Sequence, residues 1–445
     1  IEIHGNEQFH LGRNPALCQY TLKDPTISRQ HLRIQCILYD QFLSSIAPFI
    51  YAANVSSHII SLGQNRFDRK VPMHPGQTFL LEDGDEIRIS QMITLVFHTV
   101  HQTMDSVLTP MQDWERQKFV SLYRITGRLL GEGSFGKVLI AVNEKTGSQV
   151  ACKVIAIKIR ANANATRNEA LKCFREFNVL EQLSHPNIIS LEQVYWSVNN
   201  VYIFQELITG GDLFSYLGYR GNRLANAEAA FIIWQILKGI EYLHGQSITH
   251  RDLKPENILM SSLGVGARVV ITDFGNARFV PRQVDLAGVE MQSQRMFSQN
   301  GTLPYSAPEI YQGNPTVTEG IGYSKSVDMW SIGCIAATIL TGQVLFGTQD
   351  PRYEDPEKIK FLASECDLSI IDDEYHATWT KIDWRAKDLI KHLVVLDENA
   401  RMTAAQALLH KWFTGDHKFD GVYQQAIEGW KPRRRESALI ESLAA

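Results

Sequence analysis

Two kinds of hydrophobic spacing, one after the other, constrain how this chain of 445 residues can fold. Up to about residue 100, apolar and polar residues alternate in short runs, as at residues 31–36, 85–89 and 93–97, and turn residues such as Asp83-Gly84 separate the runs. Alternation with a period of two is typical of β-strands that bury one face. Several such strands without a convincing helix predict a small all-β sandwich.

Helical spacing begins only further along the chain. After more strands at residues 122–157, apolar residues recur with helical spacing at 169–183 and 227–244, and a further, apolar helix is expected at 327–340. Strands followed by helices predict an α+β body with two lobes. We therefore divide the chain into a sandwich (1–100), a linker or short helix (101–121), a two-lobed domain (122–413) and a tail (414–445).

Composition excludes several classes of protein. Forty-four basic and 48 acidic residues give a net charge of −4, so the overall charge gives no support for direct binding to nucleic acid. No apolar run reaches the roughly 18 residues of a membrane-spanning helix, so no membrane is expected. Six scattered cysteines without a CxxC pair indicate buried free thiols in a reducing compartment. The chain begins at Ile1 without Met or a signal-peptide pattern, and we expect residues upstream of it.

Three glycines, Gly131, Gly133 and Gly136, mark a candidate phosphate-binding turn. Glycine lets backbone N–H groups approach phosphate oxygens closely. A Walker A loop needs Ser or Thr where Val138 stands, and a dinucleotide site needs a helix where residues 138–142 predict a strand. A nucleotide loop of the protein-kinase type remains, with a plain hairpin turn as the alternative. The candidate nucleotide-binding residues of this segment are Leu130, Gly131, Glu132, Gly133, Ser134, Phe135, Gly136, Lys137 and Val138.

A charged residue follows in an apolar strand. Lys153 stands between Cys152 and Val154, and burying a charge is costly unless it is paired or binds an anion. The predicted partner is Glu176 on the next helix, and together they would hold the α- and β-phosphates of a nucleotide. The alternative for Glu176 is a solvated position on that helix.

Two motifs decide the interpretation of the larger domain: His250-Arg251-Asp252-Leu253-Lys254-Pro255-Glu256-Asn257 and Thr272-Asp273-Phe274-Gly275. With the glycine turn and Lys153 in order before them, residues 122–413 resemble the eukaryotic protein kinases. The resemblance implies ATP and Mg²⁺ as cofactors, Asp252 as acceptor of the substrate hydroxyl proton, and Asn257 and Asp273 as magnesium ligands. Lys254 is expected to contact the γ-phosphate and marks serine/threonine specificity.

The kinase resemblance also places the hinge and the substrate contacts. Glu206 and Leu207 are expected to form the nucleotide-binding hinge, after Gln205 in the gatekeeper position. Asp212 is placed to meet either the ribose of the nucleotide or a basic residue of the substrate, and Glu256 to meet an arginine of the substrate. They predict protein substrates with an Arg-x-x-Ser/Thr pattern.

Regulation is expected in the polar segment between Asp273 and Glu309. Ser298 is the predicted switch, because a phosphate there is expected to pair with Arg251 and order the segment; the alternative is an exposed loop serine. Thr302 is expected to contact Asp252 and to shape the peptide site. Asn276 departs from the family, which usually has Leu after Asp-Phe-Gly.

The first hundred residues carry a second resemblance. Gly12-Arg13 follows a strand, and Ser28-Arg29-Gln30-His31 comes sixteen residues later. This pattern resembles the forkhead-associated (FHA) domain, a phosphothreonine-binding sandwich. The resemblance implies that Arg13 and Ser28 contact the phosphate, that Arg29 assists and that His31 braces the loop.

One part of the FHA pattern is different here. The family has Asn-Gly in a later loop, whereas this chain offers Ser57 or His58 at the comparable place, after Asn54. The contact with the peptide backbone is therefore left open between these residues. The first strand of the sandwich is expected to lie upstream of Ile1.

An FHA domain followed by a serine/threonine kinase resembles the DNA-damage checkpoint effector kinases, and among them the fungal meiosis-specific members. This resemblance implies a nuclear location, a phosphothreonine-containing adaptor protein as partner, and activation in trans within a homodimer. Lys431 to Arg435, a small basic run, either aids nuclear import or is a solvated tail.

Two rival functions compete with this interpretation. A pseudokinase scaffold that only binds phosphothreonine is disfavoured, because Lys153, Asp252, Asn257 and Asp273 are all present. A small-molecule or tyrosine kinase is disfavoured by Lys254 and by Ala307-Pro308-Glu309, whose glutamate is expected to pair with Arg401.

Overall fold

The computed structural model describes residues 1–38, 48–64, 69–99, 108–133, 136–157, 174, 176–279, 302–311, 314, 316, 324–347, 355–415, 419–432 and 439–443. The chain forms two compact units. The first unit comprises Ile1–Cys173, Ser190–Gly211 and Arg434–Ala445, and the second comprises Phe174–Ile189 and Asp212–Arg433.

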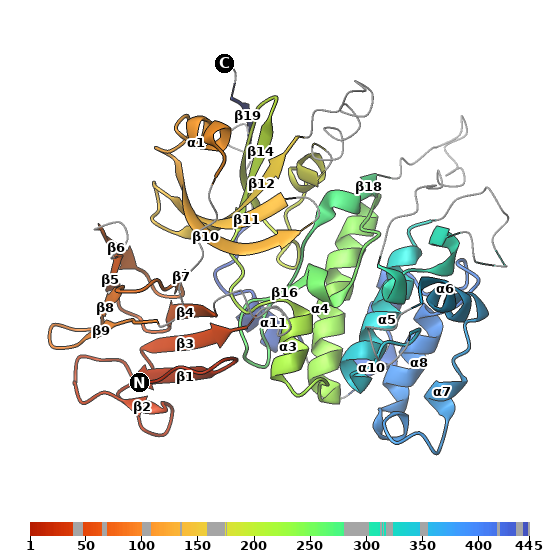
Figure 1. Cartoon of the computed structure of the whole chain (residues 1–445). Coiled ribbons are helices and arrows are strands. Elements are labelled where there is room, and N and C mark those ends of the chain that lie inside the picture. The colour runs from red at the N-terminus through yellow and green to blue at the C-terminus, as the bar shows by residue number, and fades with distance from the viewer. Residues whose placement is uncertain are drawn as a thin grey trace. The chain divides into compact units, whose positions relative to one another are not determined.

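The first 99 residues form two sheets around one apolar core, in agreement with the predicted sandwich (Figure 1). In the first sheet the strand order is β2-β1-β3-β4-β7, and in the second it is β6-β5-β8-β9. Residues of β5 alternate between buried and half-buried, as the sequence pattern predicts, so Ile60 and Leu62 point into the core. The strands are β1 (Gln8–Gly12), β2 (Tyr20–Thr21), β3 (Leu32–Ile37), β4 (Phe49–Asn54), β5 (Ile60–Gln64), β6 (Arg69–Met73), β7 (Thr78–Leu80), β8 (Glu86–Arg88) and β9 (Thr94–Val96).

The rest of the first unit is a six-stranded sheet with the order β10-β11-β12-β14-β13-β19. Its strands are β10 (Tyr123–Gly133), β11 (Gly136–Asn143), β12 (Gln149–Ala156), β13 (Leu191–Trp196), β14 (Asn200–Glu206) and β19 (Ile440–Ser442). Helix α1 (Pro110–Arg116) begins with a capping box between Thr109 and Gln112. Its buried Glu115 accepts hydrogen bonds from Asn200 Nδ2 and from the Tyr202 hydroxyl, both at 2.8 Å. Part of the expected linker is thus a helix bonded to this sheet.

The C-terminal strand β19 joins the same sheet. It runs parallel to β13, with Val194 opposite Ile440, and Val194 N donates to Leu439 O at 2.7 Å. Gln193 Nε2 donates to Glu441 Oε1 at 2.9 Å. Residues of the expected tail therefore complete the edge of the sheet.

The second unit is mainly helical. The two long helices match their predicted ranges: α4 is Asn226–Gly245, and α5 is Val327–Thr341, every residue of which is buried. The α5 helix packs on α4 and α8, the latter closely at Gly333, where an added Cβ would lie 2.5 Å from Val394 Cγ2 (Figure 1). Residues 176–180 are helical too. The other α-helices are α3 (Leu213–Tyr219), α6 (Pro356–Glu365), α7 (Ser369–Asp372), α8 (Trp384–Leu393), α9 (Ala404–Leu408), α10 (Lys411–Thr414) and α11 (Phe419–Ala426).

Short elements connect these helices. Two antiparallel two-stranded sheets, β15 (Ile248–Thr249) with β18 (Arg278–Phe279) and β16 (Ile258–Met260) with β17 (Val269–Ile271), flank the two kinase-like motifs of the sequence. The 3₁₀ turns are η2 (Pro255–Asn257), η3 (Phe274–Asn276), η4 (Leu303–Tyr305), η5 (Pro308–Tyr311) and η7 (Trp379–Lys381).

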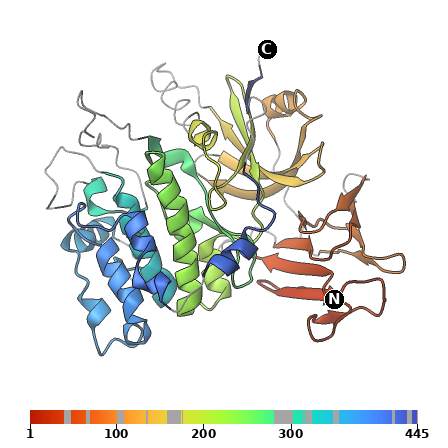
Figure 2. The ribbon, with the colours of Figure 1, turned by 180° about the vertical axis from the view of Figure 1, so that it is seen from behind.

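Helix α11, from the expected tail, packs on α4. The Phe419 ring lies 5.3 Å from that of Phe231, and the Tyr423 ring lies edge-on to Trp234 at 5.0 Å; Figure 2 shows α11 beside α4. The Tyr423 hydroxyl donates to buried Asn187 Oδ1 at 2.7 Å. This aromatic cluster fixes the tail to the helical unit.

Candidate active site

The glycine segment is a β-hairpin in the structure. Strands β10 and β11 pair Gly131 with Val138 and Gly133 with Gly136, and the chain continues as a strand. This geometry excludes both a Walker A loop and a dinucleotide site, because each requires a helix after the glycines. Gly136 has a φ of +143°, and a Cβ there would lie 2.2 Å from the carbonyl oxygen of Val154, so only glycine fits. Ser134 and Phe135 lie outside the described residues.

Lys153 lies in the neighbouring strand β12, opposite Val138 of β11 and Ile203 of β14. Cys152 and Val154 on either side of it are buried, whereas Lys153 is half-buried and so remains accessible from one side. Glu176 is buried and belongs to the second unit, so its pairing with Lys153 stays a prediction.

The expected hinge follows β14 in the first unit. Glu206 is tied to Ser190 twice: its backbone N–H donates to Ser190 O, and its Oε1 accepts from Ser190 N, both at 3.0 Å. Gln205 is buried, while Leu207 is half-buried. The side chain of Glu206 therefore fixes the backbone at the end of β14. Binding of a nucleotide at Glu206 and Leu207 stays a prediction.

In the second unit, Asp328 of α5 holds the catalytic motif. Its carboxylate accepts from His250 N at 2.9 Å, from Arg251 N at 2.8 Å and from His244 Nε2 at 2.9 Å. Burial acts to raise the pKa of Asp328, but the bond and charge of His244, with the other donors, outweigh it and lower the pKa. The ionised carboxylate thus fixes Arg251 in its left-handed conformation (φ +74°), just before Asp252.

The Asp252 carboxylate is surrounded by hydrogen-bond donors. Thr302 Oγ1 donates to its Oδ1 at 3.1 Å, and Lys254 Nζ donates to Thr302 Oγ1 at 2.8 Å, so the expected contact of Thr302 is present. Lys254 Nζ also lies 3.9 Å from Asp252 Oδ2. Asn257 Nδ2 donates to the backbone oxygen of Asp252 at 2.8 Å, and Asn276 Nδ2 donates to Oδ2 at 3.3 Å. A carboxylate fixed in this way can accept a proton from a substrate hydroxyl within hydrogen-bond reach.

Asp273 begins the η3 turn in a left-handed conformation, with φ +60° and ψ +74°. The next residue, Phe274, is fully buried, and its ring meets that of His250 edge-on at 4.9 Å. Packing of Phe274 thus anchors Asp273 in the same unit as the catalytic loop.

The side-chain oxygens of Asn257 and Asp273 are of the kind that magnesium binds. Asn257 directs its amide nitrogen at Asp252, so its side-chain oxygen would be the ligand, and Asp273 would supply a carboxylate. Magnesium prefers such oxygen ligands, and when bound it neutralises charge on the nucleotide phosphates.

A second cluster with metal-ligand chemistry has a different explanation. Asp388, His392 and His410 place ligand atoms within 4.8 Å of one another. His410 Nδ1 accepts from Trp412 N at 3.2 Å, so its Nε2 carries the proton and donates to Asp388 Oδ2 at 3.0 Å. Lys411 Nζ lies 2.9 Å from the same oxygen. We assign this cluster to an ion-pair network.

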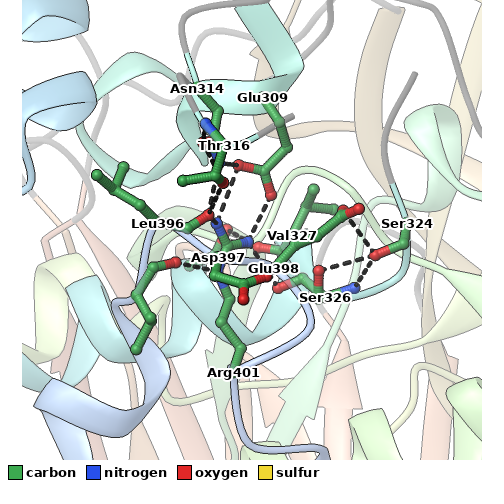
Figure 3. Close-up of polar contacts among 12 residues, drawn as sticks. Glu309, Asn314, Thr316, Ser324, Ser326, Val327, Leu396, Asp397, Glu398 and Arg401 are labelled. Atoms are coloured by element: carbon green, nitrogen blue, oxygen red, sulfur yellow. Dashed lines mark hydrogen bonds and ion pairs between the residues drawn. The ribbon is translucent and has the colours of Figure 1, made fainter. Parts of the chain in front are cut away.

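Ala307-Pro308-Glu309 is braced by a buried ion pair. Arg401 Nη2 donates to Glu309 Oε2 at 2.9 Å, and both side chains are fully buried. Asn314 Nδ2 donates to the same Glu309 oxygen at 3.0 Å, and Ser324 Oγ contacts Ser326 and Glu398 beside the pair (Figure 3). The end of the expected activation segment is thus tied to residues 396–401.

Asp212 caps helix α3, its Oδ1 accepting from Ser215 N at 2.7 Å. Burial raises the pKa of this carboxyl to about 6, and the charge of Glu256 adds to the increase, although the bonds from Ser215 oppose it. A buried carboxyl with a second acidic side chain beside it forms a place where a cation is favoured.

Arg13, Ser28 and Arg29 lie together in the sandwich. They line an open pocket of about 890 Å³ that also includes Ser57 and His58. Two backbone bonds, Arg13 N to Ser28 O and Asn14 N to Arg29 O, join the two loops. The pocket brings two guanidinium groups and hydroxyls together in one place.

Two histidines support this pocket. Ser28 N donates to Nδ1 of buried His31 at 3.0 Å, and burial, helped by the charge of His58, lowers the pKa of His31, so that it stays neutral and accepts this bond. His58 Nδ1 lies 3.3 Å from Ser28 Oγ. The His58 carbonyl accepts from Asn54 Nδ2 at 2.7 Å, so the loop that carries His58 is fixed.

Three contacts in these sites were not predicted from the sequence. They are the hydrogen bonds from the backbone of His250 and Arg251 to Asp328, the bond from Asn276 to Asp252, and the contact of His58 with Ser28. Asp328 lies 77 residues from Arg251, so no local signal joins it to the motif, and the sequence offered His58 only as one of two candidates for a peptide contact. The departure of Asn276 from the family pattern is the one signal in the sequence that points to a special role.

The comparisons with known proteins agree with this geometry. Residues 124–413 match the family model described as protein kinase domain. The chain therefore belongs to the protein kinase family. It is a serine/threonine protein kinase, an enzyme of a class that uses ATP with magnesium.

Relatives extend this likeness over almost the whole chain. The meiosis-specific serine/threonine-protein kinase mek1 of Schizosaccharomyces pombe is 33% identical over 418 residues, covering 93% of this chain and 83% of the relative. The corresponding MEK1 of Saccharomyces cerevisiae is 30% identical, over 93% of this chain and 82% of the relative. Human calcium/calmodulin-dependent protein kinase type 1B is 34% identical over 67% of this chain and 77% of the relative.

Within the described residues, no helix is long and apolar enough to cross a bilayer. The predicted switch, Ser298, lies outside the described residues.

Proposed function

We propose that this serine/threonine kinase is recruited to its place of action by an N-terminal FHA domain that binds phosphothreonine on an adaptor protein. The observation that carries the proposal is the gathering of Arg13, Ser28 and Arg29 in one pocket of the sandwich. A phosphate dianion accepts charge-assisted bonds from guanidinium groups and a further bond from a hydroxyl.

The binding half is tested with the purified full chain and fluorescent peptides carrying phosphothreonine, phosphoserine or unmodified threonine. The phosphothreonine peptide is expected to bind best, and Arg13→Ala and Ser28→Ala are expected to weaken binding at least tenfold. Arg88→Ala removes an exposed cation from β8, outside the pocket, and serves as the matched control. Equal binding of phosphorylated and unmodified peptides would contradict the proposal.

The substrates are proposed to be proteins with arginine three residues before the target serine or threonine. Asp212 and Glu256 support this preference, because their neighbouring carboxylates favour a cation. A serine peptide library with Mg-ATP, and Asp252→Asn as the inactive control, tests it. No gain from upstream arginine would reject the preference without affecting the assignment as a kinase.

Phosphorylation of Ser298 is proposed as the activating switch, and the phosphate is proposed to pair with Arg251. The phosphorylation is proposed to occur in trans, between the two chains of a homodimer. The support is the sequence position of Ser298 between Asp273 and Glu309. A Ser298→Ala protein with full activity after incubation with Mg-ATP would remove this proposal.

The process is proposed to be checkpoint signalling in DNA damage or meiotic recombination, in the nucleus. The support is the likeness to two kinases named as meiosis-specific, which extends over the sandwich as well as the kinase domain. A fluorescently tagged chain is expected to enter the nucleus of meiotic cells and to collect there in foci. The Arg13→Ala variant is expected to lose these foci. A uniformly cytoplasmic signal would speak against this location.

A further inference from the structure

The residue after Asp-Phe-Gly contacts the catalytic carboxylate. Asn276 Nδ2 lies 3.3 Å from Asp252 Oδ2. The kinase family usually carries leucine at this position, which has nearly the same shape as asparagine and no polar group. The chain thus replaces an apolar side chain with a hydrogen-bond donor directed at the group expected to accept the substrate proton.

Asn276 is the nearest donor to that oxygen among the described residues. Asn257 Nδ2 is 3.4 Å from Oδ2, but it already donates to the backbone oxygen of Asp252 at the much shorter distance of 2.8 Å. Lys254 Nζ is 3.9 Å from Oδ2 and donates to Thr302 instead. Among the described residues, Asn276 thus donates the shorter of the two amide bonds to Oδ2, and its bond is the one that comes from outside the loop of Asp252 itself.

Both sides of Asn276 are anchored. On its N-terminal side, Phe274 is fully buried against His250, and Ala277 N donates to Phe274 O at 3.0 Å to close the η3 turn. On its C-terminal side, β18 pairs with β15, with Arg278 opposite Thr249. An amide held between two anchored segments loses little freedom when it bonds to Asp252, so the bond can orient the carboxylate.

The bonds to the two carboxylate oxygens come from separate segments. Thr302, at the end of the activation segment, holds Oδ1, and Asn276, after Asp-Phe-Gly, holds Oδ2. An ionised carboxylate accepts about four hydrogen bonds, so free lone pairs remain for a substrate hydroxyl. Donors on opposite oxygens restrict rotation of the carboxylate plane. The rate of proton transfer from the substrate hydroxyl depends on the orientation of the carboxylate that receives the proton.

We propose that Asn276 is a positioning residue that fixes the Asp252 carboxylate for phosphoryl transfer, a role that the leucine of related kinases does not perform. This role concerns the kinase reaction itself and is independent of the proposed FHA function.

The test compares Asn276→Leu and Asn276→Ala with the wild-type full chain, using Mg-ATP and a serine peptide. Loss of a hydrogen bond to a charged group is expected to lower kcat by about tenfold in both variants. The KM for ATP is expected to change less than twofold, because binding of the nucleotide does not require a particular orientation of the Asp252 carboxylate. Asn399→Leu, which alters an exposed asparagine that bonds to Asp397, is the matched control.

A double variant separates positioning from a general structural effect. In an Asp252→Ala background there is no carboxylate to orient, so Asn276→Leu is expected to leave the residual single-turnover rate unchanged. Thermal unfolding of each variant shows whether the fold is intact. A fall in kcat below threefold in both single variants, a rise in kcat, or a further loss in the Asp252→Ala background would overturn the proposal.

Discussion

Arg401 and Glu309 form an ion pair in which neither side chain is exposed to solvent. The guanidinium uses Nη1 and Nη2 for the two carboxylate oxygens, and its Nε donates to Val395 O at 2.6 Å. Asn314 supplies one more bond to Glu309, so the buried charges have donors and acceptors on every side (Figure 3). Such a pair is sensitive to loss of one partner, because the other charge then stays buried without compensation.

Glu309→Gln is therefore expected to destabilise the second unit by about 3–5 kcal/mol, although glutamine has nearly the same shape as glutamate. Chemical denaturation followed by tryptophan fluorescence measures the effect. The control is Glu357→Gln, which removes the exposed partner of Lys360 and is expected to change stability by less than about 1 kcal/mol. Equal shifts for the two variants would show that the Arg401 pair is no more important than a surface pair.

Two glycines of the same hairpin, Gly136 and Gly131, are expected to respond differently to substitution by alanine. Gly136→Ala is expected to distort the β11–β12 pairing and to raise the KM for ATP at least tenfold, because its Cβ would lie 2.2 Å from Val154 O at a φ of +143°. Gly131→Ala meets no atom within 4 Å and is expected to leave the hairpin intact. ATP titration of the two variants checks the difference. Similar ATP affinities would mean that the close approach at Gly136 is relieved at little cost.

Strand β19 is expected to protect the edge of its sheet. A chain that ends at residue 433 loses the bonds from Val194 N to Leu439 O and from Gln193 Nε2 to Glu441 Oε1. Hydrogen exchange at Val194 is expected to become at least tenfold faster, because its amide then faces solvent. Gln193→Ala removes only the side-chain bond and is the control. An unchanged exchange rate in the shortened chain would show that β19 does not stay on this edge.

The elements that could be predicted from the sequence are those with local signals. Helix α4 carries a periodic apolar stripe and α5 is apolar throughout, and the ends of both lie within one or two residues of the predicted ones. The glycine hairpin followed from the strand pattern after Gly136, and the sandwich followed from alternation. Arg401 was expected beside Glu309 only through the kinase resemblance, since 92 residues separate them.

Contacts between distant side chains could not be predicted. The three-residue strand β19 is too short for a periodic signal and exists because β13 offers it a free edge. Helix α11 packs through Phe419 and Tyr423 on aromatic residues of α4, almost 200 residues earlier. The bond from Asn276 to Asp252 depends on the backbone of two separate loops. Such contacts belong to tertiary structure, which local spacing does not encode.

The acidic pair at the expected substrate site predicts a dependence on pH. Burial and Glu256 raise the pKa of Asp212 to about 6, from an ordinary value of 3.8. Ionisation of Asp212 thus opposes folding, and its contribution to stability is lost as pH rises from about 3.8 through about 6. For substrate binding the sign is reversed, because only the ionised carboxylate attracts an arginine.

The preference for a peptide with upstream arginine over the same peptide with alanine is therefore expected to fall about tenfold between pH 7 and pH 5, since Asp212 is mostly protonated one unit below its pKa. The ratio of kcat/KM for the two peptides measures the preference and cancels effects of pH on other groups. Asp212→Asn keeps the cap of helix α3, because asparagine also accepts a bond from Ser215 N, but it cannot ionise. Its preference is expected to be weak and constant across this range, and a wild-type preference that is equally constant would show that Asp212 does not contact the arginine.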